Sequence, residues 1–130
     1  MEIPFIDQLA IQLTNTLPGR NAHIRMAPFP GRFDELPTQD TKNAAVMILI
    51  MGESANLYFP LIKRNPISTR DPHKGQVSLP GGRQELSDYN LLFTALRETQ
   101  EEIGIPADQI KIVGALSPLF IPVSNNLVHP

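Results

Sequence analysis

Three glutamates in one short run limit what this chain can fold into more than any other feature. The run extends from Arg97 to Ile105 and contains Glu98, Glu101 and Glu102. In a helix, positions i, i+3 and i+4 lie on one face, so the three carboxylates would crowd a small patch. Their repulsion favours a bound cation, and clustered oxygen ligands suit a hard divalent ion such as Mg²⁺ or Mn²⁺. The alternative is a solvated helix face on which Arg97 pairs with Glu101.

The segment that precedes this run favours the metal-binding interpretation. It begins with Leu79-Pro80-Gly81-Gly82, an apolar segment that turns at two glycines. The loop, the glycines and the acidic helix together resemble the Nudix box. In that family a glycine and an upstream glutamate precede the pattern Arg-Glu-aliphatic-x-Glu-Glu-x-Gly-aliphatic. The matching positions are Arg97, Glu98, Glu101, Glu102, Gly104 and Ile105.

Two features depart from the family pattern. Thr99 occupies a position that is usually aliphatic, and the spacing from Gly82 to Arg97 is longer by a single residue. The longer spacing assigns the upstream acid of the box to Asp88, with Glu85 as the alternative.

A second motif resembles the coenzyme A diphosphatase branch of this family. That branch has two arginines, a histidine near Gly-x-Val and a Phe-Pro-Gly-Gly segment before the box. Here Leu79 replaces the phenylalanine, and extra residues between Arg64 and Gly75 make Arg70 the second arginine. The resemblance implies substrate binding by four side chains, although for His73 an ordinary loop histidine is an equal alternative. The four residues are Arg64, Arg70, His73 and Lys74.

The charge distribution agrees with a diphosphate substrate. The cations Lys63, Arg64, Arg70, Lys74 and Arg83 are accompanied by a single acid, Asp71, whereas acids predominate over residues 85–102. Arginine and lysine can hold phosphates while a metal ion bridges the reacting oxygens. The alternatives are a solvated basic loop and a glycine corner that only turns the chain.

The resemblance therefore implies a metal-dependent hydrolase. We expect Glu98 and Glu102 to bind the metal with the backbone carbonyl of Gly82, and Glu101 to be a third ligand or the general base. Arg97 is expected to orient the carboxylates. The leading hypothesis is cleavage of coenzyme A or its thioesters into adenosine 3′,5′-bisphosphate and 4′-phosphopantetheine or its acyl form. The alternatives are another nucleoside diphosphate-X substrate, such as ADP-ribose, and a non-catalytic binding module.

Composition restricts the remaining possibilities. The net charge of −2 is unlike that of a general nucleic-acid-binding protein. The chain has no cysteine, which rules out disulfides and thiolate chemistry and fits a cytoplasmic protein. Neither a signal peptide nor a membrane span is read from the sequence. The expected partner is a small nucleotide substrate.

Periodicity predicts the elements. We expect a helix over residues 5–17, an irregular arm over 21–42, and strands at 44–51, 57–62, 76–79 and 111–116. The acidic helix should be capped by Ser87 or Asp88 and end at Gly104. Its predicted inner side contains Leu92, Ala95, Leu96, Thr99 and Ile103, and its outer side contains Asn90, Thr94 and the glutamates. Pro118 and Pro122 make residues 119–123 an improbable central strand.

The predicted fold is an α/β/α Nudix sandwich with a mixed sheet. The arm would occupy residues 1–42 and the Nudix domain residues 43–130, without its C-terminal part. A further core strand should begin near Val128. We expect the strands that complete the sheet to be absent before Pro130. The chain should then either associate with a second copy or be part of a longer native chain, and its activity should be weaker than that of a full-length form.

Overall fold

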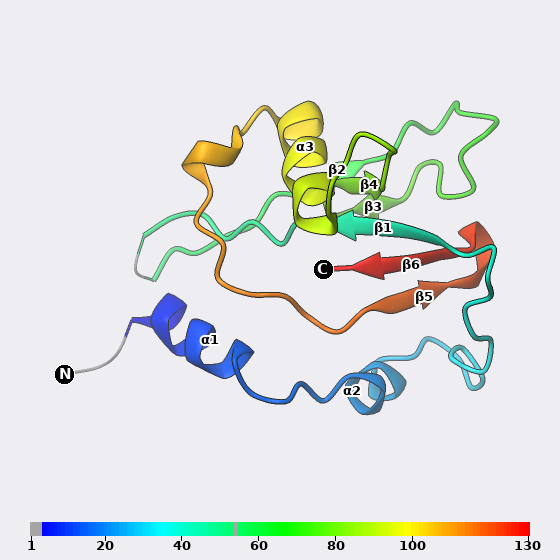
Figure 1. Ribbon diagram of the computed structural model, residues 1–130, viewed down its shortest axis with the longest axis horizontal. Helices are drawn as coiled ribbons and strands as arrows, with labels where there is room; N and C mark the ends of the chain where they lie inside the picture. Colours follow the sequence, from blue (N-terminus) through cyan, green and yellow to red (C-terminus); the bar gives the residue numbers. More distant parts are fainter. Residues whose placement is uncertain (1–3, 54) are drawn as a thin grey trace.

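The computed structural model describes residues 4–53 and 55–130, and it has a mixed α/β fold built on one main sheet (Figure 1). Its strand order is β4-β1-β6-β5. Strand β1 (Lys42–Val46) pairs antiparallel with β4 (Gly81–Arg83) and parallel with β6 (Asn126–His129). Strand β5 (Leu119–Ile121) pairs antiparallel with β6 and forms an edge. The predicted mixed sheet is therefore confirmed.

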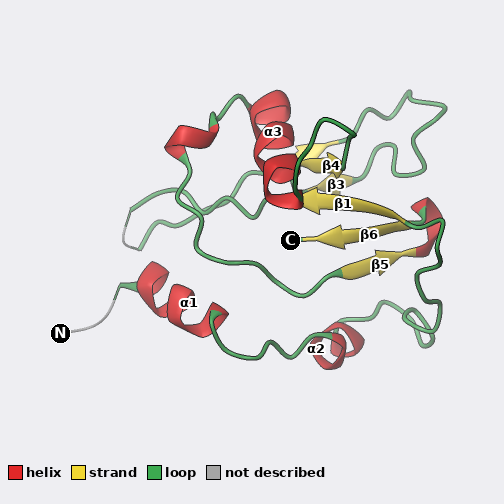
Figure 2. Ribbon diagram, in the orientation of Figure 1, coloured by secondary structure: helices red, strands yellow, loops and turns green. Residues whose placement is uncertain are grey.

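Helix α3 (Leu91–Ile103) packs against β1 and β4 (Figure 2). The small buried side chains of Ala44, Ala45 and Ala95 let the helix and the sheet approach closely. Thr99, which replaces the usual aliphatic residue, is fully buried, and its hydroxyl donates to the carbonyl of Ala95 over 2.7 Å. This internal hydrogen bond satisfies the hydroxyl, so a threonine is tolerated in the core.

The predicted faces of α3 are partly wrong. Ala95 and Thr99 are buried as expected, but Leu92 is 45% exposed. Thr94, predicted on the outer side, is 0% exposed because its hydroxyl donates to the buried carboxylate of Asp88 over 2.9 Å.

The ends of α3 follow the usual capping rules. The side-chain oxygen of Asn90 accepts a hydrogen bond from the backbone N–H of Phe93 over 2.8 Å. The N-cap is therefore Asn90, and the predictions of Ser87 and Asp88 are wrong. At the other end Gly104 adopts a left-handed φ of 74°, which confirms the predicted terminator.

The predicted strand over residues 44–51 is wrong in its extent. Strand β1 ends at Val46, and beyond it Met47 donates to the carbonyl of Pro80 over 2.8 Å. The expected hairpin with residues 57–62 is reduced to an isolated bridge between Met51 and Tyr58. Instead β2 (Ile62–Lys63) pairs with β3 (Val77–Ser78), which lies within the strand predicted at 76–79.

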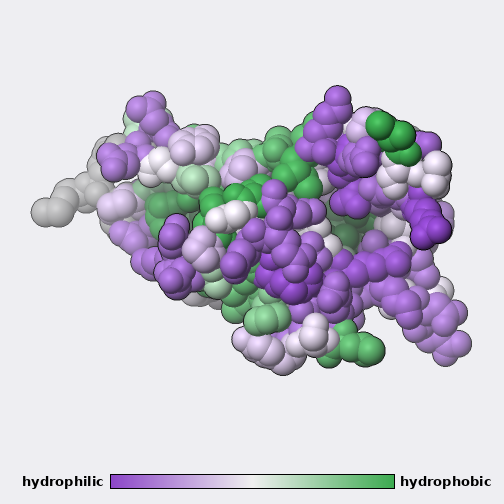
Figure 3. All heavy atoms as spheres, turned by 90° about the horizontal axis from the view of Figure 1, so that it is seen from above, coloured by the Kyte–Doolittle hydropathy of each residue, from purple (hydrophilic) through white to green (hydrophobic). Residues whose placement is uncertain are grey.

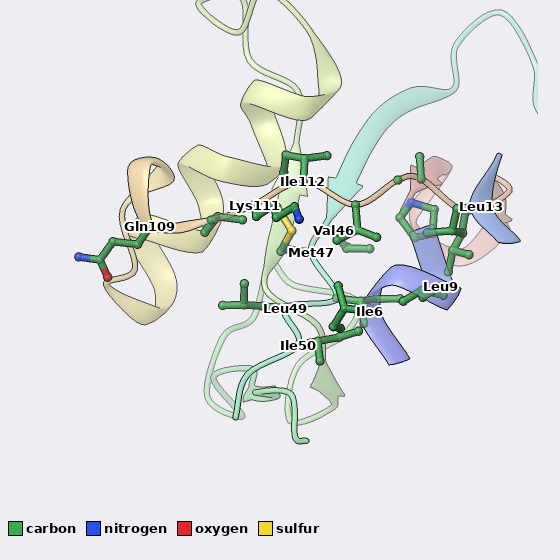
Figure 4. A pocket seen from close by; sticks show the side chains of 17 residues that line it. Ile6, Leu9, Leu13, Val46, Met47, Leu49, Ile50, Gln109, Lys111 and Ile112 are labelled. Atoms are coloured by element: carbon green, nitrogen blue, oxygen red, sulfur yellow. The ribbon is translucent and has the colours of Figure 1, made fainter. Parts of the chain in front are cut away.

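Residues 111–116 do not form the predicted strand. Together with residues 46–50 and helix α1 (Phe5–Leu13) they line an apolar cavity of about 450 Å³, whose side chains are shown in Figure 4. An apolar run has the same sequence pattern whether it pairs in a sheet or lines a cavity, which explains why a strand was predicted here. The chain passes through the short 3₁₀ helices at Ala107–Gln109 and Pro122–Ser124.

Two strands of the main sheet, β5 and β6, come from the last residues of the sequence. Strand β6 pairs along its whole length with β1 and adds a parallel strand to the sheet. A strand was expected to begin near Val128, and β6 begins at Asn126. Residues 119–121 form an edge strand and not a central one, as the flanking prolines predict.

The N-terminal arm is more regular than predicted. Helix α1 ends at Leu13 instead of residue 17, and α2 (Arg20–Arg25) lies in the segment expected to be irregular. The guanidinium of Arg32 donates to the carbonyl of Phe120 in β5 over 3.2 Å, so the arm is attached to the edge of the sheet. None of the helices over the described ranges 4–53 and 55–130 is long and apolar enough to cross a membrane.

Candidate active site

The glycine corner at the start of β4 lies directly against the acidic face of α3. Gly82 pairs with Ala45 in β1, and a Cβ atom added to Gly82 would lie 2.6 Å from the carboxyl carbon of Glu98. The backbone N–H of Gly81 donates to the carboxylate of Glu102 over 2.8 Å. The sheet register and the helix therefore bring both carboxylates to the corner. The N–H of Gly81 is a partner that the sequence did not reveal.

Arg97 connects the loop before α3 with the carboxylates on the helix. Its Nε and Nη2 atoms donate to the two carboxylate oxygens of Asp88 over 2.9 and 2.8 Å. Its Nη1 atom donates to Glu98 over 2.9 Å and to Glu101 over 3.2 Å. The Glu85 carboxylate is further away, at 3.9 Å, and its side chain is 63% exposed. The loop acid in contact with the helix is thus Asp88, and one cation faces several carboxylates.

The carboxylate of Asp88 is saturated with hydrogen bonds. Its side chain is fully buried, and it accepts from Arg97, from the hydroxyl of Thr94 and from the backbone N–H of Glu85. The Arg97 guanidinium is the main reason that the pKa of Asp88 lies well below its ordinary value. In turn Asp88 raises the pKa of Arg97. Asp88 is therefore an anion that orders the loop, and Thr94 is a partner that the spacing of the sequence did not indicate.

Glu98 has a different environment from Asp88. Its side chain is 15% exposed, and burial raises the pKa of its carboxyl, an effect that the neighbouring Arg97 opposes. The carboxylates of Glu101 and Glu102 also favour its protonated form. A cation at the corner would relieve this unfavourable ionisation.

The arrangement fits a divalent ion held by two carboxylates. Over the described ranges 4–53 and 55–130, no group of three or more His, Cys, Asp or Glu side chains converges closely enough to hold a metal. The predicted triplet is accordingly divided, with Glu98 and Glu102 at the Gly81–Gly82 corner and Glu101 paired with Arg97. Mg²⁺ commonly uses one or two protein carboxylates and completes its shell with waters and substrate phosphates. Two glutamates at a corner with close backbone approach suit that requirement.

The predicted substrate-binding residues lie in the loop between β2 and β3, residues 64–76. Arg64 is paired there with Asp71 over 2.6 Å, and the His73 ring is 3.2 Å from the side-chain oxygen of Gln76. Within the described part of the chain, Arg70 and Lys74 take part in none of the ion pairs. Figure 3 shows hydrophilic side chains over the middle and right of the face seen from above. Two loop cations are therefore available for an anionic ligand.

Comparison with known proteins assigns the family. The model of the NUDIX domain matches residues 41–127, which include the corner, α3 and most of the sheet. The chain therefore belongs to the Nudix family, whose hydrolases generally use divalent metal ions.

Its relatives are bacterial and plant proteins of the same family. An uncharacterized Nudix hydrolase NudL of Klebsiella aerogenes is 36% identical over 83 residues, covering 64% of this chain and 67% of the relative. NudL of Yersinia enterocolitica is 38% identical over 92 residues, or 71% of this chain and 44% of the relative. Nudix hydrolase 22, chloroplastic, of Arabidopsis thaliana is 44% identical over 80 residues, or 61% and 26%. The match thus spans less than half the length of these last two relatives.

Proposed function

We propose that this chain carries the site for hydrolysis of the diphosphate bond in coenzyme A or its thioesters. The products would be adenosine 3′,5′-bisphosphate and 4′-phosphopantetheine or its acyl form. The observation that carries the proposal is the contact of the Gly81–Gly82 corner with Glu98 and Glu102. Membership of the Nudix family supports hydrolysis, and the cationic loop before the corner supports the choice of substrate.

Each acidic residue has a proposed role. Glu98 and Glu102 hold Mg²⁺ or Mn²⁺, with the backbone carbonyl of Gly82 as a further ligand. The bound ion would lower the pKa of water and neutralise charge on the phosphates. Glu101 is the candidate general base, because its side chain is 57% exposed and can reach a water. Arg97 orients Glu98 and Glu101, because its Nη1 atom donates a hydrogen bond to each carboxylate.

The cationic loop supplies the proposed recognition of phosphate. Arg70 and Lys74 are the loop cations outside the ion pairs of the described residues, and His73 lies next to Lys74. Coenzyme A carries a 3′-phosphate in addition to its diphosphate, whereas ADP-ribose does not. A loop that binds the additional phosphate would favour coenzyme A by charge-assisted hydrogen bonds.

A substrate screen tests the proposal. Release of adenosine 3′,5′-bisphosphate from coenzyme A should require Mg²⁺ or Mn²⁺ and should exceed hydrolysis of ADP-ribose and NADH. The matched control is Glu98→Gln, which keeps the size of the side chain and removes its charge. Faster hydrolysis of ADP-ribose would assign the site to another nucleoside diphosphate. Tight binding of coenzyme A without turnover would make it a binding module.

A further inference from the structure

The loop of residues 64–76 contains a single acid, and both oxygens of its carboxylate are used inside the loop. Asp71 accepts from Nε of Arg64 over 2.6 Å through one oxygen, and from the backbone N–H of His73 over 2.9 Å through the other. The Asp71 side chain is 18% exposed and that of Arg64 is 33% exposed. Partial burial makes this charge-assisted pair stronger than an ordinary surface ion pair.

The same two residues join the start of the loop to its end. The backbone N–H of Arg64 donates to Gln76 over 2.9 Å, and its carbonyl accepts from Gly75 over 3.2 Å. Lys74 donates its backbone N–H to the carbonyl of Asp71 over 3.2 Å. Arg64 is therefore fixed through its backbone and its side chain. Asp71 connects it to the turn that contains His73 and Lys74.

This turn leads directly into the active-site corner. Residues 73–76 are followed by β3 (Val77–Ser78), which pairs with β2, and then by Gly81 and Gly82. A change in the loop at Asp71 would move the adjoining cation of Lys74 relative to the corner. Arg64, whose Nε already donates to a carboxylate, is less available to a phosphate than Lys74 or Arg70.

From this geometry we propose that Asp71 is a positioning residue for phosphate recognition: it holds Arg64 as an internal strut, so that His73 and Lys74 face the substrate. The proposal rests on the proposed diphosphatase function. It assigns Arg64 a supporting place in the loop instead of direct contact with a phosphate. The proposal predicts that removing Asp71 raises KM for coenzyme A. If Arg64 were a phosphate ligand that Asp71 merely restrains, removing Asp71 would lower KM.

Steady-state kinetics with coenzyme A distinguishes the two roles. With Asp71 as a positioning residue, Asp71→Ala should raise KM about tenfold and leave kcat within about threefold, because the reacting groups at Glu98 and Glu102 stay in place. Arg64→Ala should have a similar effect, and the double variant should be no worse than either single variant. If Asp71 merely restrained a phosphate-binding Arg64, Asp71→Ala would lower KM, which would overturn the proposal.

Limited trypsin digestion gives a readout that does not depend on turnover. Trypsin can cut the bond between Lys74 and Gly75, which does not include position 71, and Asp71→Ala should speed cleavage at this bond about tenfold. Asp71→Asn keeps an acceptor for the His73 N–H, so its cleavage rate should lie between those of wild type and Asp71→Ala. Asp108→Asn, at an exposed acid outside the loop, is the matched control and should behave as wild type. Unchanged cleavage in Asp71→Ala would refute the strut, and faster cleavage with unchanged KM would refute the positioning role.

Equilibrium binding separates this proposal from the proposed function. If wild type hydrolyses none of the nucleotides, the diphosphatase assignment fails. Asp71→Ala should still weaken binding of adenosine 3′,5′-bisphosphate measured by calorimetry. Equal binding by the two proteins, or none by either, would overturn the role of Asp71.

Discussion

Gly82→Ala should reduce turnover while leaving the fold intact. The new Cβ would lie 2.6 Å from the carboxyl carbon of Glu98 and 3.0 Å from its Oε2 atom. Ordinary contacts between carbon atoms are about 3.5 Å, so the carboxylate must withdraw by roughly 1 Å. The end of a glutamate side chain can move this far without displacing the sheet. Misplacing a reacting group by about 1 Å can lower the rate by about a hundredfold.

The assay is hydrolysis of coenzyme A across a Mg²⁺ series, together with thermal unfolding. Gly82→Ala should lose about a hundredfold in kcat/KM and unfold close to the wild-type temperature. Gly81→Ala is the contrasting variant, because its Cβ would lie 2.6 Å from the backbone Cα of Val46. A backbone clash of this kind should destabilise the fold by about 1–3 kcal/mol. Wild-type turnover and metal affinity in Gly82→Ala would refute the placement of Glu98 at the reacting centre.

Three further predictions concern charge. Glu98→Gln and Glu102→Gln should each lower turnover about a hundredfold or more without changing the unfolding temperature, and near wild-type Mg²⁺-dependent rates would remove them from the metal site. Folding lowers the pKa of Asp88 below its ordinary value of 3.8. The carboxylate therefore stabilises the fold at pH values above 3.8, and this stabilisation is lost as the pH falls below that value. Asp88→Asn should therefore be less stable at neutral pH and lose less stability on acidification, as urea titrations from about pH 6 to about pH 3 would show. Lys74→Ala should raise KM for coenzyme A more than for dephospho-coenzyme A, and equal losses would exclude recognition of the 3′-phosphate.

Local rules were sufficient for the acidic helix and its surroundings. The spacing of the glutamates and Gly104 fix backbone geometry within a few residues, and the structure has α3 where these features predict it. The glycine corner was expected to turn the chain after a strand at 76–79, and it is instead part of β4. The sequence also indicated that Asp88 is the loop acid, but not that its buried carboxylate would draw in the hydroxyl of Thr94. Side-chain periodicity could not show this, because the contact depends on a loop whose path the sequence does not reveal.

Long-range pairing explains most of the remaining errors. Residues 47–50 and 111–116 are apolar because they surround a cavity, and the same pattern would suit buried strands. Strand β6 begins at Asn126, two residues before the strand expected near Val128, because β1 and β5 offer hydrogen bonds on both of its sides. Ladder partners so far apart in the chain leave no local signal. The charge of Arg64 likewise predicts a substrate contact, but the sequence does not reveal that its guanidinium pairs with Asp71.

The hydrogen bond from Arg32 to the carbonyl of Phe120 places the N-terminal arm against the edge strand β5. Among residues 4–53 and 55–130, strand β5 has a ladder partner on one side only, and an open strand edge is a template on which other chains can extend a sheet. A guanidinium placed on this edge occupies an acceptor and adds charge where an incoming strand would align. An incoming strand would have to displace this guanidinium to pair with the carbonyl of Phe120, so the arm that precedes the matched domain hinders growth of the sheet at β5.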